Sequence, residues 1–304
     1  MILVTGVTGG LGGLILNGLK GIDDIEVVPG TRKGDGSAAR RIDFDDPASL
    51  AEGFAGVDVL VFISAGYAED DIVLARHGAV ADAARAAGVK HVIYTSLASS
   101  GERMTIALPH RWTEDRLANG PFEVTILRNG LYTEIPLGLA LTGAAMAAET
   151  GIFAAPFGDG RVSVVAKEDL ADIAVRVAVE TDRDLAAGNQ SRHAGRTYEL
   201  EGPTPIGGNE IAEVLTESLG RPVTYQSISL SDLRQGLEGS GMLPYQITHT
   251  LSIFSNVKAG WTEARHSDLE ALLPNVPRPV HDSIVAAVKA GGFESQSLSS
   301  SGES

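Results

Sequence analysis

The sequence predicts an α/β protein with a Rossmann-type, doubly wound parallel sheet followed by a smaller mixed α/β C-terminal lobe. From the first residue to about Arg128, short runs rich in β-branched residues alternate with helical stretches, which is typical of βαβ units. A glycine-rich turn joins the first run to the first helical stretch, and Asp46-Pro47 has the pattern of a helix start. The predicted strands are Ile2–Thr5, Glu26–Val28, Arg40–Ile42, Asp58–Ile63, His91–Thr95 and Glu123–Arg128.

After Tyr132 the pattern changes to a mixture of helices and short strands. The predicted helices are Leu137–Glu149, Asp169–Val179, Asn209–Leu219, Ser231–Leu237, Tyr245–Val257 and Val280–Lys289, and the predicted strands are Val162–Val165, Thr197–Leu200 and Val223–Gln226. We therefore expect a main domain over residues 1–132 and a smaller lobe over residues 133–292 that caps the carboxyl edge of the sheet and lends elements back to it. Residues 293–304 are expected to be a disordered tail, because they are too polar to offset the entropy of ordering.

Composition excludes several kinds of chemistry. The chain of 304 residues has no cysteine, which rules out disulfides, thiolate catalysis and cysteine-ligated zinc, and we expect no metal site. A formal net charge of −15 argues against nucleic-acid binding, because such a field repels phosphate backbones. The sequence has neither a long apolar run nor a secretory leader pattern, so we expect no membrane association and a cytoplasmic location.

The turn after the first strand has the spacing of a dinucleotide-binding loop. It reads Gly6-Val7-Thr8-Gly9-Gly10-Leu11-Gly12 and opens a helix. In this motif Gly6 allows the tight turn, Gly9 lets the backbone approach a pyrophosphate, and Gly12 allows close packing of helix on strand. We expect Gly6, Thr8, Gly9, Gly10, Leu11 and Gly12 to contact the cofactor. The alternative is an ordinary strand-to-helix turn, but the strand before it and the helix after it favour the cofactor loop.

The residues after the second strand indicate which dinucleotide is bound. An NAD site usually has an acidic residue here that holds the ribose hydroxyls, whereas this chain has Arg32 and Lys33. A guanidinium pairs with the 2′-phosphate of NADP(H), and a carboxylate would repel it. We therefore expect a strong preference for NADP(H). The alternative interpretation of Arg32 and Lys33 is a solvated basic loop.

Six segments carry a family pattern. They are Val4–Gly9, Asp43–Asp46, His77–Val89, His91–Ser96, Leu127–Glu134 and Tyr198–Leu200. Through them the chain, from Met1 to about Val288, resembles the NmrA-like atypical short-chain dehydrogenases, and most closely the NADPH-dependent quinone oxidoreductases of the second type. The resemblance implies that Asp43 and Phe44 border the adenine, and that Ser64, Ala65 and Gly66 pass along the ribose and pyrophosphate. It also implies that Thr95, Ser96, Asn129 and Gly130 lie near the nicotinamide, although each of these residues singly could be purely structural.

The usual catalytic pair of short-chain dehydrogenases is missing. None of the six tyrosines has a lysine four residues later, and the matching positions hold His110 and Glu114. These two residues share one face of a helix, so Glu114 could orient His110 or raise its pKa. The catalytic candidates are therefore His110, Glu114 and Ser96. The alternative for His110 is a helix-start histidine that bonds to its own turn.

The missing pair argues against reduction of alcohols or sugars and favours an acceptor that needs little acid catalysis. Hydride transfer to a quinone produces a stabilised phenolate, so the sequence indicates an NADPH-dependent oxidoreductase with a small quinone-like or other activated acceptor. Tyr132, Trp112 and Phe157 are candidates to stack on a flat ring, or else belong to the core between the lobes. A regulatory protein that senses NADP(H) without catalysis is the alternative, and a homodimer is possible.

Overall fold

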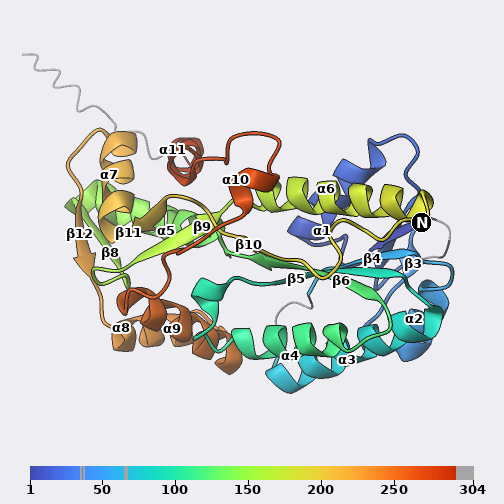
Figure 1. Ribbon diagram of the computed structural model, residues 1–304. Coiled ribbons are helices and arrows are strands. Elements are labelled where there is room, and N and C mark those ends of the chain that lie inside the picture. Colours follow the sequence, from blue (N-terminus) through green and yellow to red (C-terminus); the bar gives the residue numbers. More distant parts are fainter. Residues whose placement is uncertain (35, 37, 65–67, 292–304) are drawn as a thin grey trace, which may run out of the picture.

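The structure is a computed structural model that describes residues 1–34, 36, 38–64 and 68–291 (Figure 1). Its main sheet has the strand order β10-β6-β5-β4-β1-β2-β3, and every pair of neighbours is parallel. The strands are β1 (Ile2–Val4), β2 (Val27–Thr31), β3 (Arg40–Arg41), β4 (Val59–Phe62), β5 (His91–Leu97), β6 (Glu123–Asn129) and β10 (Thr197–Leu200). This order confirms the predicted Rossmann-type fold.

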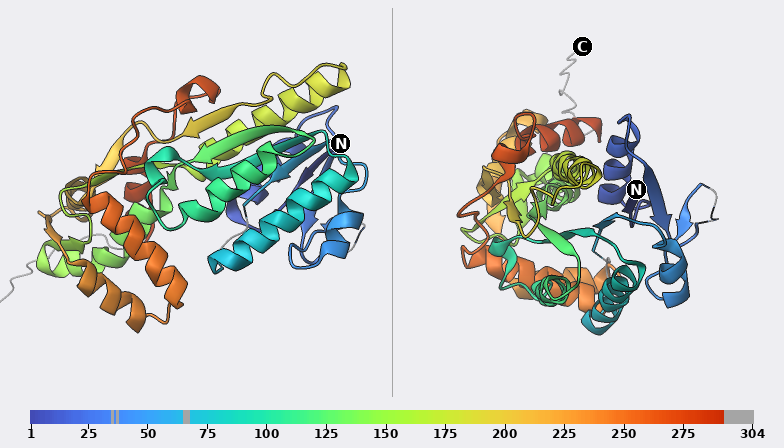
Figure 2. Two further views of the ribbon diagram at one scale, coloured as in Figure 1. Left: turned by 60° about the horizontal axis from the view of Figure 1, so that its bottom comes forward. Right: turned by 45° about the vertical axis from the view of Figure 1, so that its right-hand side comes forward.

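Helices cover both faces of the main sheet (Figures 1 and 2). One face carries α1 (Gly10–Lys20) and α6 (Lys167–Ala186), and the other carries α2 (Pro47–Gly53), α3 (Asp70–Ala87) and α4 (Ala107–Ala118). The side chains of β1 alternate accordingly, because successive residues of a strand point to opposite faces. Ile2 and Val4 pack in the core beneath α1 and α6, and Leu3 packs in the core beneath α2 and α3.

Local sequence signals set several helix ends. The Asp46 side chain accepts a hydrogen bond from the Ala48 N–H at the start of α2, and Pro47 occupies the first turn, as the sequence predicts. Helix α3 ends at Gly88, which has a φ of 70° and so adopts the left-handed conformation that glycine tolerates best. These caps fix where the chain leaves each helix to enter the next strand.

The second half of the chain supplies β10 and α6 to the main sheet and builds a separate lobe. The lobe contains β7 (Leu131–Tyr132), α5 (Glu134–Thr150), β8 (Ile152–Ala155), β9 (Arg161–Val165), β11 (Pro205–Gly207), α7 (Gly208–Leu219), β12 (Thr224–Ser227), α8 (Leu230–Gly239), α9 (Pro244–Lys258) and α11 (Val280–Ala290). The short helices η1 (Ser99–Gly101) and α10 (Leu269–Leu272) lie beside β5 and β10 in the fold. Strands β7, β8 and β11 are not among the strands that the sequence predicts.

Strand β7 follows β6 almost directly and pairs with β9, so the lobe is attached at the carboxyl end of β6. Residue 132 falls inside this small sheet, and the division of the chain at that residue stays a prediction. The expected tail, residues 293–304, lies outside the described residues. Among the described helices, none combines the length and hydropathy required to cross a bilayer.

Three histidines have lowered pKa values: His77 on α3, His91 on β5 and His110 on α4. Burial lowers the pKa of His77 to about 3, of His91 to about 4 and of His110 to about 4. Burial has the opposite effect on an acid and raises the pKa of Glu201 to about 7. The histidines therefore stay neutral in the folded protein at pH values where the unfolded chain would protonate them.

We expect the free energy of unfolding to fall as the pH is lowered from 6.5 toward 4.5. The unfolded chain takes up protons on these histidines below their ordinary pKa of 6.5 and the folded chain does not, so each costs about 1.4 kcal/mol per pH unit in this window. Glu201 opposes the trend, but it is one group against three. Urea unfolding at several pH values measures the slope, which should decrease in His91→Gln and persist in the exposed-site control His266→Gln. A free energy of unfolding that is constant between pH 6.5 and 4.5 would contradict the lowered pKa values of these histidines.

Candidate active site

The glycine turn brings α1 into close contact with the carboxyl end of β1. Gly6 has a φ of 63°, and the Gly9 N–H donates to the Gly6 carbonyl at 2.9 Å, which closes the turn. A Cβ at Gly12 would overlap the Gly6 carbonyl oxygen and lie 2.8 Å from its carbonyl carbon. The sequence-based roles of Gly6 and Gly12 in the turn and the packing therefore agree with the backbone geometry.

The N-terminus of α1 presents open hydrogen-bond donors. Thr8, Gly9 and Gly10 are exposed, Gly9 at the cap position has no side chain to satisfy the first amides, and no acidic residue lies in the first turn. Leu11 is buried, so its contribution to this site is its backbone. Uncapped amides at a positive helix end are suited to bind a pyrophosphate. This geometry fits the dinucleotide loop that the sequence predicts.

A lysine that the sequence pattern does not reveal stands beside this turn. Lys167 begins α6, and its side-chain Cδ lies 3.6 Å from the position that a Cβ on Gly10 would occupy. Its Nζ forms an ion pair with Glu134 at 2.6 Å and lies 5.0 Å from the ring centroid of Tyr132. The fold thus adds a cation near the helix N-terminus, and no local signal connects Lys167 with a turn so distant in the sequence.

Arg32 and Lys33 follow β2 at the same edge of the sheet and are exposed. Within the part of the chain that the structure describes, neither side chain makes a hydrogen bond or an ion pair. Nearby Asp45 accepts two hydrogen bonds from Arg76, and these are the main reason why the pKa of the Asp45 carboxyl is lowered. The charge of Arg32 lowers this pKa further. Since Arg76 occupies this carboxylate, the two basic residues after β2 remain available to a ligand.

Asp43 and Phe44, expected to border the adenine, lie in the loop after β3. The Asp43 N–H donates to Ser49 Oγ at 3.0 Å, and Phe44 packs edge-on against Phe62 with ring centroids 5.7 Å apart. Thr95, at the end of β5, accepts the Ser64 N–H on its buried hydroxyl at 3.0 Å. These contacts shape the sheet edge, while the ligand contacts of these residues stay predictions. Ala65 and Gly66 lie outside the described residues.

His110 bonds to a tyrosine of the sheet. Its Nδ1 lies 3.0 Å from the hydroxyl of Tyr94, which is fully buried, while His110 itself is half-buried at the start of α4. Burial, together with the charge of Arg111, lowers the pKa of His110 to about 4 and outweighs the opposite effect of Glu114. His110 is thus neutral near pH 7, and its bond is to Tyr94 rather than to its own turn.

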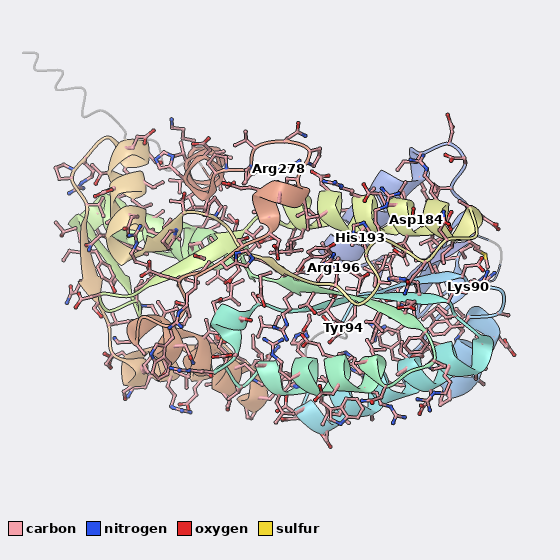
Figure 3. All side chains as sticks on the ribbon, viewed as in Figure 1. Lys90, Tyr94, Asp184, His193, Arg196 and Arg278 are labelled. Carbon is pink, nitrogen blue, oxygen red and sulfur yellow. The ribbon has the colours of Figure 1, made fainter. Side chains whose placement is uncertain are left out.

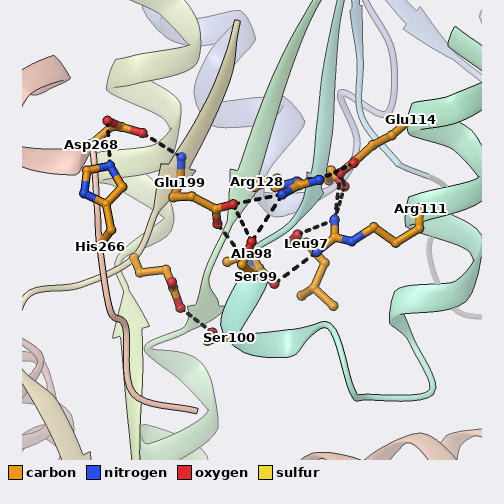
Figure 4. Close-up of polar contacts among 12 residues, drawn as sticks. Leu97, Ala98, Ser99, Ser100, Arg111, Glu114, Arg128, Glu199, His266 and Asp268 are labelled. Carbon is orange, nitrogen blue, oxygen red and sulfur yellow. Dashed lines mark hydrogen bonds and ion pairs between the residues drawn. The ribbon is translucent and has the colours of Figure 1, made fainter. Parts of the chain in front are cut away.

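Glu114 belongs to an arginine cluster instead (Figure 4). Its carboxylate accepts from Arg128 at 2.6 and 3.0 Å, from Arg111 at 2.7 Å and from Ser96 Oγ at 2.5 Å. Burial opposes ionisation, but the bonds from Arg128 and Ser96 and the charge of Arg111 lower the pKa of Glu114. The prediction that Glu114 orients His110 is wrong, because two guanidiniums hold the carboxylate elsewhere. The charge of Glu114 does raise the pKa of His110, but burial and the charge of Arg111 outweigh this effect. A catalytic role for Ser96 stays a prediction, and its hydroxyl donates to Glu114.

The arginine cluster extends from α4 to the edge strand. Arg128 on β6 also pairs with Glu199 on β10 at 3.0 Å, and Glu199 accepts the Ser99 hydroxyl at 2.6 Å (Figure 4). Close by, the Asn129 carbonyl accepts the Ala98 N–H at 2.9 Å, and the Gly130 N–H donates to the Leu200 carbonyl at 2.8 Å. The carboxyl ends of β5, β6 and β10 are therefore locked together. The roles of Asn129 and Gly130 beside the nicotinamide stay predictions.

Of the three aromatic candidates, only Tyr132 lies near the glycine turn. Trp112 packs over Gly78 of α3 and lines a groove on the outer surface of α2 and α3. Phe157 is fully buried in the lobe core, with its ring 5.7 Å from that of Phe254 in a T-shaped contact. The predicted stacking role is wrong for both, because Trp112 points toward α3 and Phe157 has no exposed surface.

Comparison with known proteins places the chain in a family. Residues 1–278 match the NmrA-like family, and quinone oxidoreductase 2 of Escherichia coli strain K12 is 34% identical over 252 residues, or 80% of this chain and 82% of that protein. The chain belongs to the NmrA-like family. This result confirms the resemblance seen in the sequence.

Two solved structures share the fold over nearly the whole chain. The triphenylmethane reductase of Citrobacter sp. complexed with NADP(H) superposes with a TM-score of 0.81 at 28% identity, covering 94% of this chain and 99% of that chain. The NADPH-dependent quinone oxidoreductase of Escherichia coli complexed with NADPH gives a TM-score of 0.80 at 29% identity, with the same coverage. The chain is thus similar in fold to reductases of two kinds of acceptor.

We expect Gly12→Ala to destabilise the protein by about 1–3 kcal/mol, because the new Cβ meets backbone atoms of Gly6 that cannot move independently. The matched control is Gly138→Ala in α5, where a Cβ meets no atom within 4 Å and alanine should stabilise the helix by about 0.5–1 kcal/mol. Urea unfolding measures both. Equal stability of the Gly12→Ala variant and the parent would show that α1 does not rest on the turn as described.

Proposed function

We propose that the protein is an NADPH-dependent oxidoreductase that transfers hydride to a small quinone-like or other activated acceptor. The observation that carries the proposal is the uncapped N-terminus of α1 at the carboxyl edge of the sheet. Arg32 and Lys33 lie at the end of the next strand and have no ion-pair partner among the described residues. This arrangement suits an anionic dinucleotide with an additional phosphate. Relatives named as NADPH-dependent quinone oxidoreductase and triphenylmethane reductase support the same class of activity.

The residues present fit the proposed cofactor. Backbone amides from Gly9 to Leu11 would hold the pyrophosphate, with Lys167 as a nearby cation, and Arg32 and Lys33 would hold the 2′-phosphate. When bound, NADPH supplies the hydride. The buried Tyr94, the half-buried His110 and the hydrogen-bonded ends of β5 and β6 form the wall of the site on the α4 side.

Neither of the two acid–base candidates on α4, His110 and Glu114, is a strong acid near pH 7. His110 is neutral near pH 7, and Glu114 is ionised and held by arginines, so neither group delivers a proton readily. This favours an acceptor whose reduced form is stable as an anion. Hydride transfer to a ring carbon conjugated with the quinone carbonyl moves an electron pair to the carbonyl oxygen. The resulting enolate becomes the phenolate when a proton shifts from that ring carbon to the other oxygen, and this anion needs only a donated hydrogen bond before water protonates it. The same reasoning disfavours aldehydes and ketones, whose alkoxides need an acid.

Arg32→Ala should weaken NADPH binding about 10- to 100-fold and leave NADH binding nearly unchanged, since only NADPH has the 2′-phosphate. Arg41→Ala is the matched control, because Arg41 is also exposed in this region but is bonded to Asp46 at 2.5 Å. Fluorescence titration with each dinucleotide gives the affinities. If the parent protein binds NADH as tightly as NADPH, Arg32 does not have the proposed role.

NADPH oxidation on addition of simple quinones, followed by its absorbance, tests the activity. We expect turnover, and a decrease in kcat of about 10-fold or more in His110→Ala through the loss of a hydrogen bond to a developing anion. Tight NADPH binding without turnover of any quinone would support the alternative, a protein that senses NADP(H). Turnover that His110→Ala leaves unchanged would make His110 structural and water the donor.

A further inference from the structure

Tyr94 is buried at a place where its hydroxyl has only a few polar groups within hydrogen-bond distance. Its ring packs against Phe62 and His77, with centroids 5.0 and 5.9 Å away, and its side chain has no exposed surface. The hydroxyl lies 3.0 Å from His110 Nδ1. Thr113, the other polar side chain close to it, is already engaged by His77 Nδ1 at 2.7 Å and by the Pro109 carbonyl at 2.6 Å. His110 Nδ1 is the hydrogen-bond partner that lies at 3.0 Å from the phenol oxygen.

Both partners are uncharged, so either the phenol O–H donates to Nδ1 or a protonated Nδ1 donates to the phenol oxygen. Burial raises the pKa of Tyr94 far above its ordinary value, and the phenol keeps its proton. Burial also leaves His110 with a single ring proton near neutral pH. When the phenol O–H donates to Nδ1, that ring proton must reside on Nε2. Nε2 has no hydrogen-bond partner among the described residues and is not one of the fully buried atoms.

We propose that Tyr94 is the positioning residue that fixes the tautomer of His110, so that the neutral imidazole presents its Nε2–H to the oxygen of the acceptor. The inference rests on the proposed function, because it assigns His110 a role toward the acceptor of that reaction. Tyr94 itself contacts neither acceptor nor cofactor, and it acts only through Nδ1.

The tautomer matters because of where charge develops. As hydride adds to a ring carbon conjugated with the acceptor carbonyl, an electron pair moves to the carbonyl oxygen, and an Nε2–H stabilises that oxygen without transferring its proton. The proton that completes the reduced product comes from water. In the other tautomer Nε2 would present a lone pair to the same oxygen and repel it. Loss of Tyr94 should therefore lower kcat and leave dinucleotide binding unchanged.

The protein offers a matched control on the opposite face of the sheet. The Tyr198 hydroxyl lies 2.9 Å from His193 Nδ1, and Tyr198 packs in the core beneath α1 and α6, whereas Tyr94 packs in the core beneath α3 and α4. Figure 3 shows Tyr94 and His193 on opposite sides of the sheet. Tyr198→Phe thus removes a phenol from a histidine as Tyr94→Phe does, at a place remote from the proposed reaction.

The test combines kinetics with nitrogen-15 NMR of the histidine rings. We expect Tyr94→Phe to lower kcat with a simple quinone about 10-fold with no change in NADPH affinity, and Tyr198→Phe to leave both unchanged. In the parent protein the His110 ring, assigned through His110→Gln, should give the signature of protonated Nε2 and bare Nδ1. Unchanged kcat in Tyr94→Phe, or a parent ring protonated on Nδ1, would overturn the proposal.

The two arms separate this inference from the proposed function. If the parent turns over no quinone, the proposed function fails, and the NMR arm still decides the tautomer. If the Tyr94→Phe protein does not fold, the spectrum of the parent alone supports or overturns the assignment. In an active protein, a Tyr94→Phe/His110→Ala double variant should be no slower than His110→Ala, because Tyr94 acts only through His110.

Discussion

The contact between the backbone of Gly6 and the first turn of α1 is the constraint on which the site depends. Without a Cβ at Gly12 the helix can rest directly on the turn, and its first amides are then held at the carboxyl edge of the sheet. Strand β1 lies between β2 and β4, so this point is flanked by Arg32 on one side and by the ends of β4 and β5 on the other. One close approach thus determines the distance of every other group from the anion-binding helix end.

Helix α4 carries two polar side chains one turn apart in different electrostatic environments. Glu114 is ionised between Arg111 and Arg128, and with Glu199 the four charges balance, so the cluster joins α4, β6 and β10 without adding net charge. His110 lies near the start of α4, where burial keeps it neutral and its partner is an uncharged phenol. Buried ion pairs contribute little net stability but specify which groups meet. Here the arginines bind the Glu114 carboxylate, so that His110 forms no ion pair with it.

The sequence predicts those features of the structure that depend on interactions between residues close together in the chain. The glycine turn and the Asp46 cap depend on neighbours in the chain, and the structure has them as predicted. The strand order follows from the alternation of elements, which burial on both faces imposes.

Side-chain partners depend on tertiary packing, and there the sequence fails. An i, i+4 spacing indicates that His110 and Glu114 share a helix face. The Glu114 carboxylate nevertheless bonds to the guanidiniums of Arg111 on α4 and Arg128 on β6, and not to His110. The aromatic rings of Trp112 and Phe157 make them candidates for stacking on a ligand, but the residue type does not indicate the direction in which a ring points. Lys167 meets the glycine turn only through the packing of α6 on α1, which no local pattern contains.

The overall charge of the chain restricts what the site can hold. A net charge of −15 repels a dinucleotide with several phosphates, so binding requires local cations that are free to face the ligand. Arg32 and Lys33 have no carboxylate partner among the described residues, whereas Lys167 is shared with Glu134. A phosphate that approached Lys167 would compete with Glu134, so this cation contributes less than an unpaired one. In the proposed complex, the 2′-phosphate at Arg32 and Lys33 would then be the part of the cofactor that this acidic protein holds best, and it is the part that NADH lacks.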